Sequence, residues 1–200
     1  MSAPWQPLLD WWFGRGATAA EVAAARGKLW FGKQDSQDSE ARERFAEQVE
    51  QALAGGLPAW QVTPQGWLAN ILLLDQLPRM LFRDSPQAFS GDALARKLAQ
   101  HGLAQGWDLQ LAPIQRVFIY LVLEHAEELA LQDQAIRHFT ALLGSAEPGE
   151  QALFAGYLDY AERHQRVIAR FARFPHRNAI LGRTSSVEES AFLLEPGSRF

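Results

Sequence analysis

Hydrophobic side chains recur along most of this chain at spacings of three and four residues, the period of an amphipathic helix. The clearest stripe lies in residues 154–171 and consists of Phe154, Tyr157, Ala161, His164, Ile168 and Phe171. We find no convincing alternation of apolar and polar residues of the kind that marks a half-buried strand. The pattern predicts an all-α fold with about nine or ten helices, and it places His164 in the core as a hydrogen-bonded residue.

Residues with capping chemistry predict where several helices begin. Thr63 precedes a proline, as an N-cap residue does when proline takes the first helical position. Pro113 and Pro148 are expected to start helices in the same way. Ser185 and Glu188 have the spacing of a capping box, which predicts a short helix near the end of the chain.

The helix expected after Thr63 is apolar on nearly every side, yet it contains an acid and a base four residues apart, Asp75 and Arg79. Pro78 lies between them and should kink the helix, because it has no N–H group for the carbonyl of Leu74. Two interpretations stay open: an internal ion pair beside a packing kink, or a charged pair that faces a ligand. In either case we expect Asp75 to pair with Arg79 or with an arginine from the C-terminal region.

A second apolar helix, expected from Pro113, ends in polar residues. Glu124 and His125 close the apolar run, and further glutamates follow at once. A histidine beside several carboxylates is well placed for proton transfer. The candidate catalytic residues are therefore Asp75, Glu124 and His125. The alternative interpretation of His125 is a core histidine with a structural hydrogen bond.

Arginines gather near the C-terminus, where residues 163–183 contain six arginines and no acid. Pro175 divides this stretch: the helix should end before it, and a new short helix should begin with it. A helix start presents unpaired N–H groups, which favour a bound anion. The candidate ligand-binding residues are Arg79, Arg173, His176, Arg177 and Asn178. The alternative is that Asp75, Glu124 and Glu128 pair with the arginines and tie down the C-terminal segment.

The composition indicates one folded domain over residues 1–200 and argues against several kinds of function. Apolar residues are 48% of the chain, which is enough for a sizeable core. We expect that core to include Trp11, Trp12, Phe13, Trp30 and Phe31. A net charge of −4 argues against nucleic-acid binding. The chain has no cysteine and no zinc or phosphate-loop motif, so we expect no metal and no cofactor.

The sequence also predicts where the protein is located. No apolar run approaches the roughly 20 residues of a membrane span. The first residues lack the basic region of a signal peptide. We therefore expect a cytoplasmic protein without a membrane partner, and the oligomeric state is left open.

Several segments, taken in order, resemble one bacterial family. They are WWFG (11–14), LWFG (29–32), ILLLDQLPR (71–79), RVFIYLVLEHAEELALQ (116–132) and RFPHRNAILGR (173–183). Over nearly its whole length the chain resembles the family catalogued as domain of unknown function 924. The resemblance implies a tetratricopeptide-repeat-like fold, a compact stack of antiparallel helix pairs, and no established activity. Family members more usually read DQFPRN and EHSE, where this chain has Leu77, Met80 and Ala126.

Two functions from different classes follow from these residues. In the first, a helical-repeat-like protein binds a small anionic molecule or an acidic peptide in a polar cleft. In the second, an enzyme uses Asp75, Glu124 or His125 as acid or base while arginines orient an anionic substrate. A purely structural domain is the third interpretation. A solvent-open pocket that held His125 within hydrogen-bond reach of a carboxylate would favour the enzyme.

Overall fold

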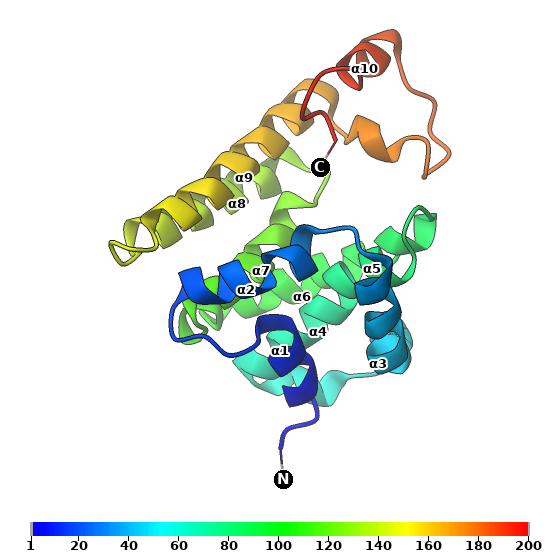
Figure 1. Ribbon diagram of the computed structural model, residues 1–200. Helices are drawn as coiled ribbons and strands as arrows, with labels where there is room; N and C mark the ends of the chain where they lie inside the picture. Colours follow the sequence, from blue (N-terminus) through cyan, green and yellow to red (C-terminus); the bar gives the residue numbers. More distant parts are fainter. Residues whose placement is uncertain (1, 200) are drawn as a thin grey trace.

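The computed structural model describes residues 2–199, which are helical with no strand among them (Figure 1). Its α-helices are α1 (Gln6–Phe13), α2 (Ala19–Phe31), α3 (Asp35–Leu53), α4 (Pro64–Ile71), α5 (Leu77–Leu81), α6 (Asp92–Ala104), α7 (Pro113–Glu124), α8 (Leu129–Gly144), α9 (Gln151–Phe171) and α10 (Val187–Phe192). The shorter elements are the 3₁₀ turns η1 (Pro58–Val62), η3 (Pro86–Phe89), η4 (Asp108–Gln110) and η5 (Pro175–Arg177), and the π-helical turn η2 (Leu72–Gln76). The prediction of an all-α fold is confirmed.

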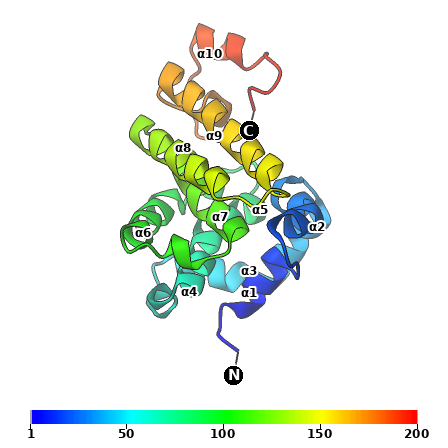
Figure 2. The same ribbon diagram turned by 90° about the vertical axis from the view of Figure 1, so that its left-hand side faces the viewer.

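Helix α7 is the central element, with α6 and α4 on one side and α8 on the other (Figures 1 and 2). Every residue from 117 to 124 is buried, as its unbroken apolar sequence predicts. Helices α8 and α9 lie side by side as the longest packed pair, and both views show them at one edge of the molecule. This packing of helix pairs is as expected, whereas a tetratricopeptide-type repeat stays a prediction.

The main core is centred on the ring of Phe118 in α7, which is fully buried. Its ring makes edge-to-face contacts with Trp12, Phe13 and Trp30, at centroid distances of 5.4, 5.5 and 4.9 Å. These geometries are the ones that aromatic pairs prefer. The aromatic residues of α1 and α2 are therefore core residues, as expected, with the exception of Phe31, which is 56% exposed.

The helix that starts at Thr63 continues from α4 through η2 to α5. Thr63 accepts a hydrogen bond from the backbone N–H of Gly66 (3.1 Å), so the predicted N-cap is confirmed. At η2 the N–H of Leu77 bonds to the carbonyl of Leu72, five residues back. Such a π turn accommodates one extra residue and often lies at a functional site. Here it precedes Pro78 and contains Asp75.

Gly91, just before α6, lets that helix start against the backbone of η2. A Cβ atom at this position would lie only 2.1 Å from the carbonyl oxygen of Leu74, the same carbonyl that Pro78 cannot pair. We expect Gly91→Ala to lower the free energy of unfolding by about 1–3 kcal/mol, since the crowded backbone must shift. Urea denaturation measures this change.

Gly27 in α2 provides the control for that substitution, because a Cβ there would meet nothing within 4 Å. Alanine in a helix interior is favoured over glycine by roughly 0.5–1 kcal/mol, so Gly27→Ala should stabilise the protein. Equal unfolding midpoints for Gly91→Ala and the parent would contradict the close approach at η2.

Two predicted helix starts are displaced in the structure. The last helix is capped by Ser186 with Glu189, one residue after the predicted pair. Helix α9 begins at Gln151, so Pro148 lies in the preceding loop. In the part of the chain from residue 2 to 199, no helix is both long and apolar enough to cross a membrane.

Candidate functional site

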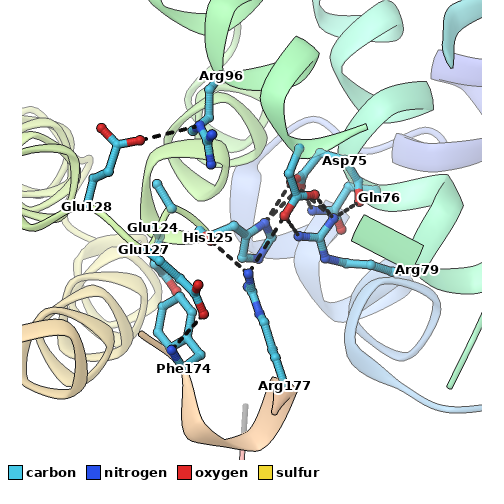
Figure 3. Close-up of polar contacts among 12 residues, drawn as sticks. Asp75, Gln76, Arg79, Arg96, Glu124, His125, Glu127, Glu128, Phe174 and Arg177 are labelled. Carbon is cyan, nitrogen blue, oxygen red and sulfur yellow. Dashed lines mark hydrogen bonds and ion pairs between the residues drawn. The ribbon is translucent and has the colours of Figure 1, made fainter. Parts of the chain in front are cut away.

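The π turn η2 places the carboxylate of Asp75 inside the protein, where the residue is 1% exposed. Arg79 lies 3.3 Å away (Nη1 to Oδ1), which confirms the predicted ion pair. The amide of Gln76 donates a hydrogen bond of 2.6 Å to Oδ2. Figure 3 shows that the ring of His125 approaches the same carboxylate from the other side.

His125 caps the C-terminal end of α7, and its ring points back toward η2 (Figure 3). Its Nδ1 lies 2.8 Å from Oδ1 and 3.0 Å from Oδ2 of Asp75. An ionised carboxylate only accepts hydrogen bonds, so Nδ1 is assigned as the donor and Nε2 as the basic nitrogen of the neutral ring. The side chain is 18% exposed. This pair has the geometry of an orienting acid and a general base.

The surroundings keep Asp75 ionised. Burial raises the pKa of its carboxyl group, but the cationic Arg79 and the neighbouring His125 lower this pKa by a larger amount. The net pKa of Asp75 is therefore well below the usual value. For Arg79, burial lowers the pKa, whereas Asp75 and Asp92 raise it by a larger amount, so the net pKa is above the usual value. Each charge therefore stabilises its partner in the ionised form.

Arg177 comes from η5 and reaches across to the same cluster. Its Nη1 donates to the backbone carbonyl of His125 (3.1 Å) and lies 3.7 Å from Asp92. The guanidinium group lies over the rings of Phe89 and Phe174, at 4.9 and 4.5 Å from their centroids. Stacking of this kind leaves the edge of the guanidinium plane as the part that can bind an anion.

The guanidinium of Arg177 is poorly compensated for a buried charge. The side chain is 8% exposed, and its Nε has no hydrogen-bond partner among residues 2–199. Burial and the nearby Arg79 lower the pKa of Arg177 to about 10, although Asp92 and Glu127 act in the opposite direction. This Nε is itself buried, so an anion could supply the missing partner only if neighbouring side chains moved aside.

Asp92 links the two arginines. It lies in the first turn of α6, and its Oδ1 is 3.1 Å from Nη1 of Arg79. We name the group formed by Asp75, Arg79, Asp92, His125 and Arg177 the central cluster. Of the sequence candidates, it unites Asp75, Arg79, His125 and Arg177. Asp92 was not among the sequence candidates, and the signal that could have found it is its position directly after Gly91, the glycine that precedes α6.

The start of η5, where we expected an anion, is occupied by a carboxylate of the protein itself. Glu127 accepts a hydrogen bond of 2.8 Å from the backbone N–H of Phe174. It also forms a two-fold ion pair with Arg183, with distances of 2.6 and 2.9 Å. Burial raises the pKa of Glu127, and the bonds from Arg183 and Phe174 lower it below its usual value. Glu127 therefore fixes the C-terminal segment to the end of α7.

The other candidates of the C-terminal stretch lie outside the central cluster. Arg173 pairs with Glu189 at 2.6 Å and bonds to the carbonyl of Thr184. Asn178 bonds to Ser185 and to Arg183. Burial, Arg177 and His164 lower the pKa of His176 to about 3, so this imidazole is neutral at physiological pH. Arg173 and Asn178 thus make contacts that hold the segment together.

Glu124 faces away from His125, toward α9. Its Oε1 is 3.0 Å from Nδ1 of His164, and both residues are buried. The same ring nitrogen lies 2.9 Å from the carbonyl of Tyr160, so the prediction of a hydrogen-bonded core histidine is confirmed. Glu128 lies 3.9 Å from Arg96. The ion pairs of Arg183, Arg173 and Arg177 are therefore with Glu127, Glu189 and Asp92, and not with the three acids we had considered.

Two cavities have volumes of about 390 and 320 Å³, and no residue of the central cluster lines either of them, so neither is a pocket that opens onto His125. The larger is lined by residues of α6, η4, α7 and α8, and the smaller by residues of α3, η1, α4, η2 and α6. Within residues 2–199, no three histidine, aspartate or glutamate side chains are grouped so that they could hold a metal ion.

Comparisons with known proteins give a family and a fold. The model of a family described as "Bacterial protein of unknown function (DUF924)" matches residues 8–197. A solved structure of ATU0120, a protein of unknown function from Agrobacterium tumefaciens, is 34% identical with a TM-score of 0.73. The match covers 88% of this chain and 98% of that one. No curated protein matches the chain.

Proposed function

Because the chain belongs to the DUF924 family of bacterial proteins, whose function is unknown, we propose a function from the geometry of the central cluster. We propose that the protein is an enzyme that acts on a small anionic substrate. Arg177 and Arg79 bind the anion, and His125 transfers a proton. The observation that carries this proposal is the hydrogen bond of 2.8 Å from His125 to the buried carboxylate of Asp75, beside a buried arginine with an unused Nε.

Anion binding is supported by the state of Arg177. Two aromatic rings hold its guanidinium group in one plane, so little side-chain entropy is lost when a ligand binds. Arg79 adds a second positive charge nearby, because both arginines lie beside Asp92. A carboxylate or phosphate group is the chemistry that such a planar donor edge recognises.

Proton transfer is supported by Asp75. A buried carboxylate beside an anion site weakens the binding of an anion, so a site built for binding alone is better without it. Asp75 instead holds the imidazole by Nδ1 and stabilises the positive charge that His125 gains when Nε2 accepts a proton. His125 is thus suited to take a proton from a water molecule or a hydroxyl group of the bound substrate.

A binding-only function differs in one respect that can be tested. A protein that only binds a small anion, or the carboxylate of an acidic peptide, would need Arg177 and Arg79. It would not need the basic nitrogen of His125. The contribution of His125 therefore separates the enzyme from the binding protein.

Anion binding is tested by calorimetry at low ionic strength with phosphate, acetate and oxalate. We expect binding that weakens as salt is added, because salt screens charge. Arg177→Lys should reduce affinity by about 10–100-fold, since hydrogen bonds to charged groups contribute roughly 1.5–3 kcal/mol. Arg170→Lys is the matched control, because Arg170 is half exposed on α9 and pairs with Glu188. If the parent binds none of these anions and Arg177→Lys unfolds, Arg177 is a structural clamp.

Proton transfer is tested by screening the parent against phosphate monoesters and carboxylic esters. We expect His125→Gln to bind product anions like the parent and to turn over substrate about 10²–10⁴-fold more slowly, the usual contribution of a general base. Turnover that survives in His125→Gln would exclude the proposed role of His125.

A further inference from the structure

The larger cavity has features of a second ligand site, on the side of α7 away from η2. Its volume is about 390 Å³, in the range of pockets that hold small molecules. Leu103, Ala141 and Leu142 give it apolar walls. Leu109 also lines it and is 68% exposed, so an apolar side chain is left uncovered at this position.

Asp108 lines the cavity with a buried carboxylate that lacks a counter-ion. The residue is 4% exposed, and its Oδ2 accepts a hydrogen bond of 2.8 Å from the hydroxyl of Tyr120. Among residues 2–199, no lysine, arginine or histidine forms an ion pair with it, although the ring of His138 is close enough to interact with its charge. Buried carboxylates in proteins are normally paired with a positive charge.

Arg116 lines the same cavity with the opposite charge. Its Nε and Nη2 donate to the carbonyls of Leu111 (3.0 Å) and Leu109 (3.3 Å), which fix the guanidinium group in place. Arg116 and Asp108 are the two charged residues of the cavity wall, and they do not form an ion pair with each other. The cavity thus presents one negative and one positive group at separate positions.

The remaining polar groups of the wall are neutral. Burial and the hydrogen bond to Asp108 raise the pKa of Tyr120, so its hydroxyl stays a donor. Burial lowers the pKa of His138, whose ring stacks on Tyr120 at 4.7 Å. The wall therefore offers one carboxyl group, from Asp108, and one guanidinium group, from Arg116, and a matching ligand carries one charge of each sign.

We propose that this cavity binds a small zwitterion, namely an amino acid with an apolar side chain. The ammonium group of the ligand pairs with Asp108, its carboxylate group with Arg116, and its side chain contacts the wall formed by Leu103, Ala141 and Leu142. The site is independent of the central cluster, and it would bind ligand without any chemistry at His125.

Leucine and phenylalanine are the probes, measured by thermal shift and calorimetry on the full chain. L-Leucinamide keeps only the ammonium group, and 4-methylpentanoate keeps only the carboxylate. We expect leucine to bind more tightly than either analogue. Asp108→Asn and Arg116→Lys should each lower the affinity for leucine at least about tenfold, because each removes or misplaces a charge-assisted hydrogen bond. Leucinamide binding should fall with Asp108→Asn alone.

The control is Lys97→Gln. Lys97 lines the smaller cavity, so this substitution should leave the affinity for leucine unchanged. The competing role for Asp108 is purely structural, a clamp from η4 to Tyr120 of α7. In that case Asp108→Asn lowers the melting temperature, and millimolar leucine leaves that of the parent unchanged. That result overturns the proposal, as does equal binding of leucine to the parent and to Asp108→Asn.

Discussion

Asp75→Asn is expected to lower the free energy of unfolding by about 3 kcal/mol at neutral pH. Removal of one partner from a buried ion pair leaves the other charge uncompensated, and losses of this size are typical. Here the partners are Arg79, at 3.3 Å, and His125, at 2.8 Å. Chemical denaturation of both proteins at pH 7 measures the difference.

Asp159→Asn is the matched control, because Asp159 also pairs with an arginine four residues later. Both partners of that pair, Asp159 and Arg163, are about half exposed. An exposed pair of this spacing contributes about 0.3–0.5 kcal/mol. A similar small effect for Asp75→Asn would show that the central cluster is open to water and would remove the basis for a buried acid–base pair.

The effect of Asp75 should also depend on pH in a defined direction. Its pKa in the folded protein is below 3.8, the value for an unpaired side chain. Its stabilising contribution is therefore complete above about pH 4 to 5 and is lost as the pH falls toward the folded pKa. The stability difference between the parent and Asp75→Asn should shrink over this acidic range. A difference that grows on acidification would contradict the lowered pKa.

Phe118→Ala is expected to destabilise the protein by about 3–5 kcal/mol, the range for phenylalanine in a core. The side chain is fully buried and contacts three aromatic rings that cannot all move into the space it leaves. Thermal and urea unfolding would measure the loss. Phe31→Ala, at a phenylalanine that is 56% exposed, should cost about 1 kcal/mol. Comparable losses at both positions would place the core elsewhere.

Local patterns in the sequence predicted the parts of the site that depend on one helix. The apolar runs identified the buried helices α4 and α7, and the four-residue spacing of Asp75 and Arg79 predicted their ion pair, because helical geometry relates such residues directly. The π turn was not foreseen. Its position just before Pro78 could have suggested it, but a simple kink accommodates a proline in a helix equally well.

Contacts between distant segments could not be derived from spacing. His125 is 50 residues from Asp75, and Arg177 is 52 residues from His125. The sequence singled out Asp75 and His125 as polar residues among apolar neighbours, and Arg177 as part of an arginine-rich stretch at a helix start. Nothing in it selected Asp75 over Glu124 as the partner of His125. The same limit hid the pair between Glu127 and Arg183, which occupies the start of η5.

The long separation between His125 and Arg177 has a consequence for how the protein is made. A ribosome adds roughly 5–20 residues per second, so about 3–10 s pass between the synthesis of these two positions. During that interval a nascent chain already carries Asp75, Arg79 and His125 but not the arginine that reaches them from η5. The proposed site therefore lacks its buried arginine until residue 177 has been synthesised, 23 residues before the end of the sequence.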